Sequence, residues 1–320
     1  MMTFRRILAL FAAVLPASLI AVILFLAVYS WPAVRFNGFG FVTSTTWNLG
    51  NTYGNPVTRG GVMVLPGAQY GILFLIAGTL LSTLIALLLA VPTGVGAAIF
   101  LAEAVPSRLR TWLSFLVELL AAVPSVVFGL WGYAVLIPLL GHHIFPVMER
   151  ALFWLPFFNG PSGSGYGLLT SGIVLSLMIV PLIAATLRDA ILAEPMVLRE
   201  AAAALGATRF ETVWRVVLPG VRKILIGVTI LATGRALGET MAVLMVSGNA
   251  LNYLPPNIYS PISTMAAFIV SQLDSALQDP TGLAVRSLAE VALVLSVISV
   301  GVNAIARLVL YRSGLKGARV

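Results

Sequence analysis

Charged residues are scarce in this chain. They make up 9% of its 320 residues, whereas 59% are hydrophobic. A soluble core of this size could not bury so much apolar surface, so lipid is expected to solvate much of it. Cysteine is absent, which excludes disulfides, thiolate metal sites and cysteine nucleophiles. The composition and the long apolar runs therefore predict an all-α polytopic membrane protein.

Histidine and lysine are almost absent as well. The two histidines are the neighbours His142 and His143, which we interpret as an exposed turn rather than a metal site. The two lysines, Lys223 and Lys316, do not follow a glycine, as the lysine of a phosphate-binding Gly-x-x-x-x-Gly-Lys-[Ser/Thr] loop does. The chain therefore cannot bind ATP by that loop, and no cofactor is expected in it.

Six apolar runs are expected to cross the membrane. The first follows Arg5 and Arg6 and is longer than the roughly 7 to 15 residues of a signal-peptide core, so we expect it to be retained. Pro92 is expected to bend the second run, and Pro124 with Ser125 to break the third. The six runs cover about residues 7–31, 72–101, 113–140, 167–187, 224–247 and 288–310.

The polar stretches between the runs divide the chain. Residues 1–70 hold the first helix and a Gly-rich outer loop from residue 32, to which we assign no role. Residues 71–312 form a core with five helices, and 313–320 are expected to form a cytoplasmic tail. Within the core, loops are expected at 141–166 and 188–223, and the moderately apolar segment 262–277 is interpreted as a loop helix or re-entrant segment.

Lysine and arginine are unevenly distributed over the alternate loops. Fourteen fall on one side of the predicted membrane, whereas only Arg35, Arg59, Arg150 and Arg286 fall on the other. By the positive-inside rule, both termini and loop 188–223 are expected to be cytoplasmic. The net charge of +8 does not indicate nucleic-acid binding, because the cations lie at the ends of apolar runs rather than in one patch.

The loop from 188 to 223 has the pattern of a short helical hairpin. Pro195 suits the first turn of a helix and Gly206 the residue that follows one. Thr208 and Glu211 are spaced as a capping box that starts a second helix. The first helix would present one small, smooth face, built from Leu198, Ala201, Ala202 and Leu205 and flanked by Arg199 and Glu200. Such a face suits docking of another protein, but an amphipathic hairpin lying on the membrane is an equally good reading of composition alone.

Arg235 is the cation that needs an explanation. It lies twelve residues beyond Lys223, which at about 1.5 Å per residue places it roughly 18 Å into a hydrocarbon core of about 30 Å. Glu239, one turn further on, would share its helix face and offer an ion pair. Gly234 and Gly238 would let a second helix approach closely. The arginine is either a structural partner of Glu239 or a transient site for an anion.

Three other charged residues, Glu118, Arg286 and Glu290, lie in or beside the apolar runs. Glu118 is either a second partner for Arg235 or interfacial, because it lies near the start of its run. Arg286 and Glu290, again four residues apart, lie nearer a membrane surface and are interpreted as structural.

The hairpin resembles the EAA loop of importer-type ATP-binding-cassette permeases. Six residues carry the resemblance: Glu200, Ala201 and Ala202, then Gly206, then Leu218 with Pro219. In that family the loop is a coupling helix that sits in a groove of a separate ATPase. The resemblance therefore implies six transmembrane helices in a type I importer arrangement, with coupling residues Glu200, Ala201, Ala202, Leu205 and Gly206.

The run from Gly234 to Val243 resembles the signature of phosphate-importer permeases, and the Met after Thr240 favours their PstC type. Residues 122–129, 90–92 and 98–103 are similar to the same subfamily. The resemblance implies a bacterial inner-membrane protein that imports phosphate by alternating access. It implies four kinds of partner: a PstA-type permease, a PstB-type ATPase dimer that binds ATP, a PstS-type periplasmic binding protein, and phosphate itself. It also implies that Arg235 and Glu239 serve transport, with Thr240, Ser125 and Glu118 as further residues of the substrate pathway.

Three other functions stay open from the sequence. The first is a permease for another oxyanion, such as sulfate or molybdate, because one guanidinium distinguishes anion shapes poorly. The second is a secondary transporter or channel that works without an ATPase. The third, an intramembrane enzyme, is the weakest, because the sequence shows no set of nucleophile and base or of metal ligands.

Overall fold

The computed structural model describes the backbone of residues 2–312 and the side chains of residues 8–308. The predicted tail at 313–320 lies outside the described residues. Five helical segments are long and apolar enough to cross a membrane: 8–37, 73–104, 125–152, 168–193 and 283–308. A sixth span results if the segments 209–220 and 222–238, which meet at 66°, are taken together. The mostly helical fold with five to six apolar spans agrees with the prediction.

The first, second, fourth and sixth apolar runs form helices close to the predicted places. The helices extend beyond the predicted limits by up to six residues, because charged and polar residues continue them outside the apolar core. The helices are α1 (Met2–Asn37), α3 (Leu73–Ile99, continued by a π turn at Phe100–Ala104), α8 (Leu168–Ala193) and α15 (Leu283–Arg312). Pro92 lies inside α3, which continues through it.

The third run is broken at Pro124, as predicted, but its helices extend well beyond the predicted limits of 113–140. A separate helix α4 (Ser107–Ala122) ends before the extended residues Val123 and Pro124. A second helical stretch then runs from α5 (Ser125–Trp131) through α6 (Ile137–Leu139) to α7 (Phe145–Leu152), joined by π turns at 132–136 and 140–144. The first half of the predicted loop 141–166 is therefore helical, and His142 and His143 are exposed in a π turn of that stretch.

Tertiary packing explains the added helix α7. The Phe145 side chain is completely buried and its ring lies 5.0 Å from that of Tyr259. Tyr259 belongs to a segment more than a hundred residues away in the chain. A local sequence pattern cannot show such a contact, so the prediction of a loop here was wrong.

The fifth run is also broken. Helix α12 (Arg222–Gly238) ends two residues before α13 (Met241–Val246), and Glu239 between them is extended. The predicted single helix over 224–247 was therefore wrong. The predicted segment 262–277 is confirmed as a shorter helix, α14 (Met265–Leu277).

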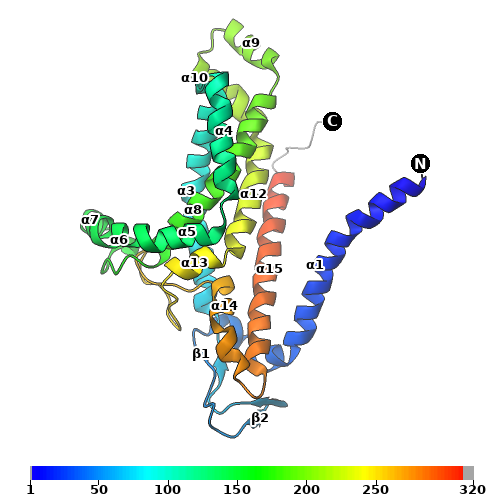
Figure 1. Ribbon diagram of the computed structural model, residues 1–320, viewed down its shortest axis with the longest axis vertical. Helices are drawn as coiled ribbons and strands as arrows, with labels where there is room; N and C mark the ends of the chain where they lie inside the picture. The colour runs from blue at the N-terminus through cyan, green and yellow to red at the C-terminus, as the bar shows by residue number, and fades with distance from the viewer. Residues whose placement is uncertain (1, 313–320) are drawn as a thin grey trace.

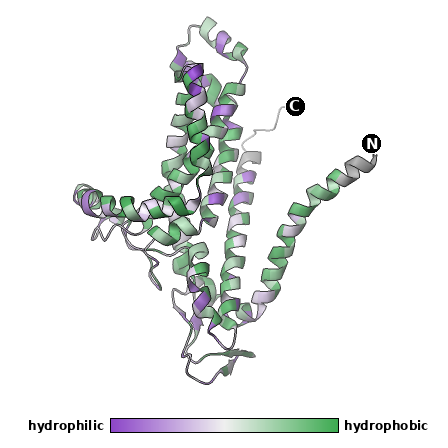
Figure 2. Cartoon of the chain, viewed as in Figure 1, coloured by the Kyte–Doolittle hydropathy of each residue, from purple (hydrophilic) through white to green (hydrophobic). Residues whose placement is uncertain are grey.

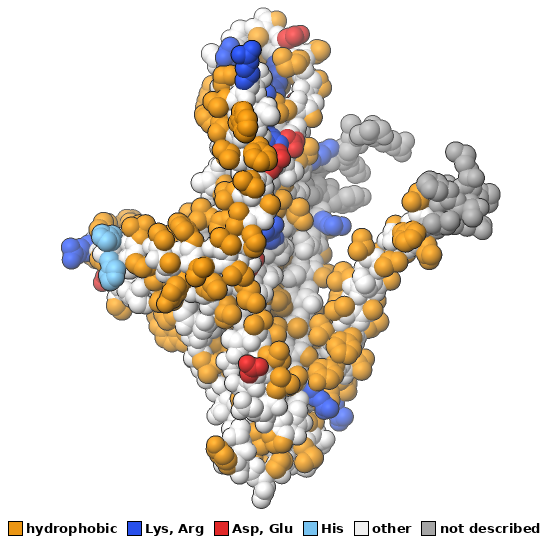
Figure 3. Space-filling model, viewed as in Figure 1, with side chains coloured by type: hydrophobic (Ala, Val, Ile, Leu, Met, Phe, Trp, Pro, Cys, Tyr) orange, Lys and Arg blue, Asp and Glu red, His pale blue; other side chains and the backbone are white. Residues whose placement is uncertain are grey.

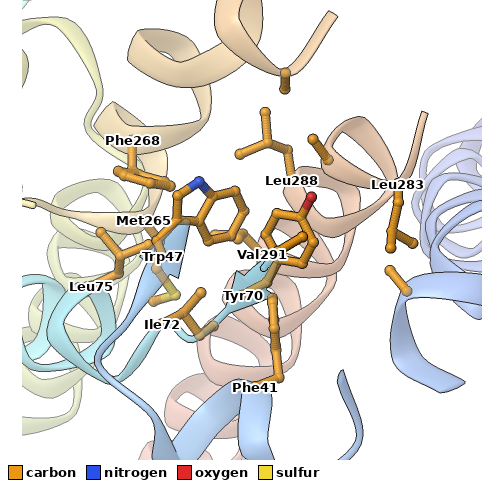
Figure 4. Close-up of a cluster of buried hydrophobic side chains, with 14 of the residues drawn as sticks. Phe41, Trp47, Tyr70, Ile72, Leu75, Met265, Phe268, Leu283, Leu288 and Val291 are labelled. Carbon is orange, nitrogen blue, oxygen red and sulfur yellow. The ribbon is translucent and has the colours of Figure 1, made fainter. Parts of the chain in front are cut away.

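Small strands and aromatic side chains give order to the first loop. After α2 (Gly40–Thr43), strand β1 (Trp47–Asn48) pairs antiparallel with β4 (Gln69–Tyr70), and β2 (Val57–Arg59) with β3 (Val62–Val64). The Trp47 ring lies 4.9 Å from that of Tyr70 and 5.0 Å from that of Phe268, both edge-on. Figure 4 shows these rings with Leu283, Leu288 and Val291 of α15. The loop is thus fixed to α14 and α15 by a buried core.

The helices form a bundle that is long in one direction. Figure 1 shows α3, α4, α8 and α12 side by side, with α9 and α10 at one end and the strands at the other. Helix α1 lies close to α15 near the strands and diverges from it towards its N-terminal end. None of its most apolar stretch of 18 residues is buried within the chain. The stretch α5 to α7 projects sideways. Hydrophobic residues run along most of the helix lengths in Figure 2, which is expected where lipid or another membrane chain covers them.

Candidate functional site

The break in the fifth run creates the surroundings of Arg235. This residue lies in the last turn of α12, and its side chain is exposed. Beyond Gly238 the chain extends, so Glu239 no longer continues the helical spiral. Glu239 instead sits before α13, where the Ala242 N–H donates to its Oε1 over 3.4 Å. An acidic side chain before a helix start is electrostatically favourable.

The predicted Arg235–Glu239 ion pair is not formed. Three ion pairs within 4 Å are present among the described side chains, and neither residue takes part in them. The prediction assumed that the two residues share a helix face, which requires a continuous helix. Because the helix ends between them, Arg235 keeps its donors available.

A hollow of about 370 Å³ lies beside Arg235. It is bounded by Leu182 of α8, by Ile230, Leu231 and Gly234 of α12, and by Asn303 of α15. Among the described residues, Arg235 is the only charged one in this lining, so none of them brings a carboxylate that competes with an incoming anion. The hollow can therefore admit a small anion to the guanidinium.

The two glycines predicted to permit close helix approach differ. A Cβ at Gly234 would lie 3.7 Å from Asn303 Nδ2, so α15 does pass close to this point. A Cβ at Gly238 would have no neighbour within 4 Å. Asn303 donates to the Ser299 carbonyl in its own helix over 2.8 Å and also lines the hollow.

Ser125 and Thr240 both stand beside a helix break. Helix α5 packs on α13 so closely that a Cβ at Gly129 would lie 2.9 Å from the Ala242 Cα, and one at Gly132 would lie 2.8 Å from Val246. Along α5 and the π turn that follows it, the later glycine contacts the later residue of α13, so the two helices run parallel. Their first residues, and hence Ser125 and Thr240, lie at the same end of the pair, and Figure 1 shows the two helices together.

Glu118 pairs with Arg188 and not with Arg235. The buried Arg188 of α8 donates from Nη2 to Glu118 Oε1 at 3.0 Å and to Asp189 Oδ1 at 2.6 Å. Arg188 and Glu118 line another hollow, of about 410 Å³, which does not include Arg235. Glu118 therefore ties α4 to α8 and is not a partner of Arg235.

The predicted hairpin is present. Helix α9 (Met196–Ala204) begins just after Pro195, and Gly206 has φ +83°, the left-handed conformation expected after a helix. The predicted face lines a hollow of about 470 Å³, to which Leu198, Ala201, Ala202, Leu205 and Gly206 all contribute. Ala202 is buried, whereas Leu205 is 90% exposed. Glu200 is exposed at the edge of the same helix. The hairpin thus offers an open apolar surface at its tip.

The capping box is also confirmed. It starts α10 (Arg209–Thr212), where the Thr208 N–H donates to Glu211 Oε2 over 3.0 Å and the Glu211 N–H to Thr208 Oγ1 over 3.3 Å. The bond from the Thr208 backbone, followed by that from its hydroxyl, lowers the pKa of Glu211. Because the folded pKa is lowered, this stabilisation is present at neutral pH and is lost as the pH falls through the lowered pKa. The chain then passes through a π turn at 213–217 and α11 (Leu218–Gly220) into α12.

Arg199 fixes the hairpin to the bundle. It pairs through Nη1 with Glu103 Oε1, in the π turn that continues α3. Its Nη2 donates to the Ile191 carbonyl, near the end of α8, at 2.7 Å. Both side chains of the ion pair are largely buried, at 18% and 25% exposed. Arg199 therefore connects α9 to two of the long helices, α3 and α8.

Sequence reasoning missed Asn303, Glu103 and Arg188. Asn303 is a polar residue inside an apolar run, and that signal could have found it. Glu103 and Arg188 were assigned to the polar stretches between the apolar runs, because hydropathy places the ends of α3 and α8 before these two residues. Their pairing depends on tertiary structure.

Comparisons with known proteins show which family the chain resembles over most of its length. Residues 94–312 match the family model for the binding-protein-dependent transport system inner membrane component. The chain is 50% identical to phosphate transport system permease protein PstC 1 of Mycobacterium tuberculosis over 86% of this chain and 82% of that protein. It is 37% identical to phosphate transport system permease protein PstC of Pasteurella multocida, over 99% and 93% respectively.

A solved structure shares the fold. A chain of a bacterial alginate ABC transporter, solved in complex with an alginate pentasaccharide-bound periplasmic protein, superposes with a TM-score of 0.60 at 17% identity. The likeness covers 98% of both chains. At this identity it shows the fold alone, which is the predicted ABC permease arrangement of type I.

Proposed function

This chain belongs to the family of binding-protein-dependent transport system inner membrane components, and we propose that it is a PstC-type permease subunit of an ATP-driven importer of inorganic phosphate. It would work in a bacterial inner membrane with both termini in the cytoplasm. Its partners would be a PstA-type permease, a PstB-type ATPase dimer and a PstS-type periplasmic binding protein. The chain would have no enzymatic role, because ATP would be hydrolysed on the ATPase.

The exposed guanidinium of Arg235, with no carboxylate in its hollow, is the observation that carries the proposal. A planar guanidinium can donate two hydrogen bonds to one oxyanion, which suits phosphate. A single guanidinium makes few contacts with an anion, which suits a permease because a permease must release what it binds. Glu239, Thr240 and Ser125 lie beside the two helix breaks, where unwound backbone adds polar groups, and we propose that they complete the route.

The tip of the hairpin would be the docking surface for the ATPase. Leu198, Ala201, Ala202 and Leu205 line an exposed apolar hollow, as a surface that receives another protein does. The Arg199–Glu103 pair would carry the movement of the ATPase into α3. Alternating access would follow when α12 and the helices packed on it change their tilt. A role for Glu118 in the pathway would be indirect, through its hold on α4.

Reconstitution tests this function. Vesicles would hold the two permease chains and the ATPase dimer, with ATP inside and the loaded binding protein outside. Radiolabelled phosphate should accumulate only with hydrolysable ATP, and a tenfold excess of sulfate or molybdate should leave the rate unchanged. Inhibition by sulfate or molybdate would favour the other-oxyanion permease. Uptake that persists without the ATPase would favour a secondary transporter.

A further inference from the structure

Three arginines gather at the end of the molecule that carries the strands. A hollow of about 630 Å³ is lined by Arg35 at the end of α1, by Arg59 at the β2–β3 turn, and by parts of the first loop. An adjoining hollow of about 370 Å³ is lined by Arg35, by Arg286 and by the other side of the same hairpin. The charge count assigns four arginines to the outer side of the membrane. Three of these four thus surround the β2–β3 hairpin.

These three arginines have no acidic partner within the described part of the chain. None of the three ion pairs includes them. Two nearby carboxylates are buried and engaged elsewhere: Asp279 accepts hydrogen bonds from Thr281 and the Ala284 N–H, and Glu290 accepts one from Asn37. Asp274 on α14 is exposed. The surface around the hairpin therefore carries an excess of positive charge.

A purely structural reading accounts for one of the three. Arg35 lies in the last turn of α1, where a cation stabilises the helix by about 0.3 to 1 kcal/mol. Arg59 is the exposed last residue of β2, just before the turn at Gly60 and Gly61, so it does not stabilise a helix end. Arg286 lies in the first turn of α15, where a cation is unfavourable.

Large apolar side chains stand exposed around the same end. Tyr53 is 98% exposed, Phe39 90%, Trp31 59% and Met63 58%. Arginine, aromatic residues and methionine are the types enriched at protein–protein interfaces, and a mixture of them suits a protein surface better than a free ion. In Figure 3 a separate group of Lys and Arg side chains lies near the lower end of α1, with hydrophobic side chains beside it.

We propose that Arg35, Arg59 and Arg286 form a docking surface for a carboxylate-rich patch on the binding protein that delivers the substrate. The proposal rests on the proposed function and on the outer placement of this end. The β2–β3 hairpin supplies the shape of the surface, because β1 and β4 on either side of it are fixed to the buried aromatic core. The arginines supply attraction and orientation, which at an interface chiefly change the association rate and its dependence on salt.

The test measures binding of the fluorescently labelled binding protein encoded with this chain to the transporter complex in nanodiscs. The variants are Arg35→Gln/Arg59→Gln/Arg286→Gln, the same triple with Lys, and the control Arg150→Gln. Arg150 is the fourth outer arginine and lies in α7, away from the hairpin. Co-purification with the second permease shows that each variant is folded.

We expect the Gln triple to raise the dissociation constant at least tenfold and to flatten its dependence on salt. The Lys triple and Arg150→Gln should stay within about threefold of wild type. At saturating binding protein, the Gln triple should reach the wild-type rate of ATP hydrolysis. An unchanged dissociation constant, or an equal loss in Arg150→Gln, would overturn the proposal. So would a lower maximal rate with normal binding, because the arginines would then act on the anion in transit. Normal docking in a complex that imports no phosphate would instead contradict only the proposed function.

Discussion

Two arginines in the long helices illustrate two uses of a cation. Arg188 is buried and donates to two carboxylates, so its charge is compensated within the chain. Arg235 is exposed in a hollow in which it is the only charged residue. A cation that is paired within the chain holds helices together, whereas an unpaired cation can bind an anion from outside the chain. We therefore propose a structural role for Arg188 and a transport role for Arg235.

Replacement of Arg188 tests the structural half of this assignment. Arg188→Met should destabilise the chain by about 1 to 3 kcal/mol, because the hydrogen bonds to two carboxylates are lost. The readout is the thermal unfolding of the purified permease pair in detergent. Glu118→Gln should cost less than about 1 kcal/mol, because its carboxylate is more than half exposed and Asp189 still pairs with the arginine. An equal loss in both variants would show that Glu118 is the main anchor.

At this scale the sequence singled out Arg235 as a candidate but did not predict its contacts. Arg235 is conspicuous because a cation in an apolar run is costly. Its separation from Glu239 was not predictable, since helical periodicity assumes that the helix continues. Arg188 was assigned to a loop, because hydropathy ended α8 at residue 187, so its pairing with Glu118 was missed.

Among the elements, the hairpin of α9 and α10 depends on the conformation of one residue. Gly206 has a positive φ, so any side chain there would be strained, although a Cβ at this position would meet no heavy atom within 4 Å. Gly206→Val should therefore reorient α9 and reduce co-purification of the ATPase at least fivefold, or uncouple its hydrolysis from uptake. Gly227→Val is the matched control, because Gly227 is helical and equally open. Unchanged co-purification with normal hydrolysis and uptake in Gly206→Val would count against docking at this hairpin.

The ion pair between α9 and α3 gives a second prediction at this scale. Arg199→Glu places two acidic groups opposite each other and should lower ATP-driven uptake at least tenfold while hydrolysis continues. The double variant Arg199→Glu/Glu103→Arg restores opposite charges and should recover at least a third of the uptake. The ratio of phosphate imported to ATP hydrolysed measures this in vesicles. If the double variant is no better than the single one, the pair does not transmit the movement.

The elements were predictable where local sequence decides them. The apolar runs give the long helices, and Pro195, Gly206 and the Thr208–Glu211 box give the hairpin. The helix α7 and the paired strands of the first loop were missed because long-range contacts stabilise them, with Phe145 on Tyr259 and Trp47 on Phe268. Such contacts join residues far apart in the chain, and no periodicity reports them.

For the whole molecule, the absence of cysteine allows a clean test of orientation. Tyr53→Cys and Leu205→Cys each introduce one thiol at a position at least 90% exposed. In cells that lack the ATPase and whose outer barrier is permeabilised, a membrane-impermeant maleimide should label Tyr53→Cys. It should label Leu205→Cys only after the inner membrane is opened. The reverse pattern would invert the predicted topology and place the arginine surface in the cytoplasm.

The central claim is that Arg235 meets the anion in transit, and uptake by the complete Arg235→Gln complex tests it most directly. Arg222→Gln is the control, because Arg222 is an exposed arginine at the start of the same helix. We predict that the Arg235→Gln complex assembles, hydrolyses ATP in response to the loaded binding protein, and imports less than a hundredth of the phosphate that wild type and Arg222→Gln import. Phosphate import by Arg235→Gln at the wild-type rate would contradict the account.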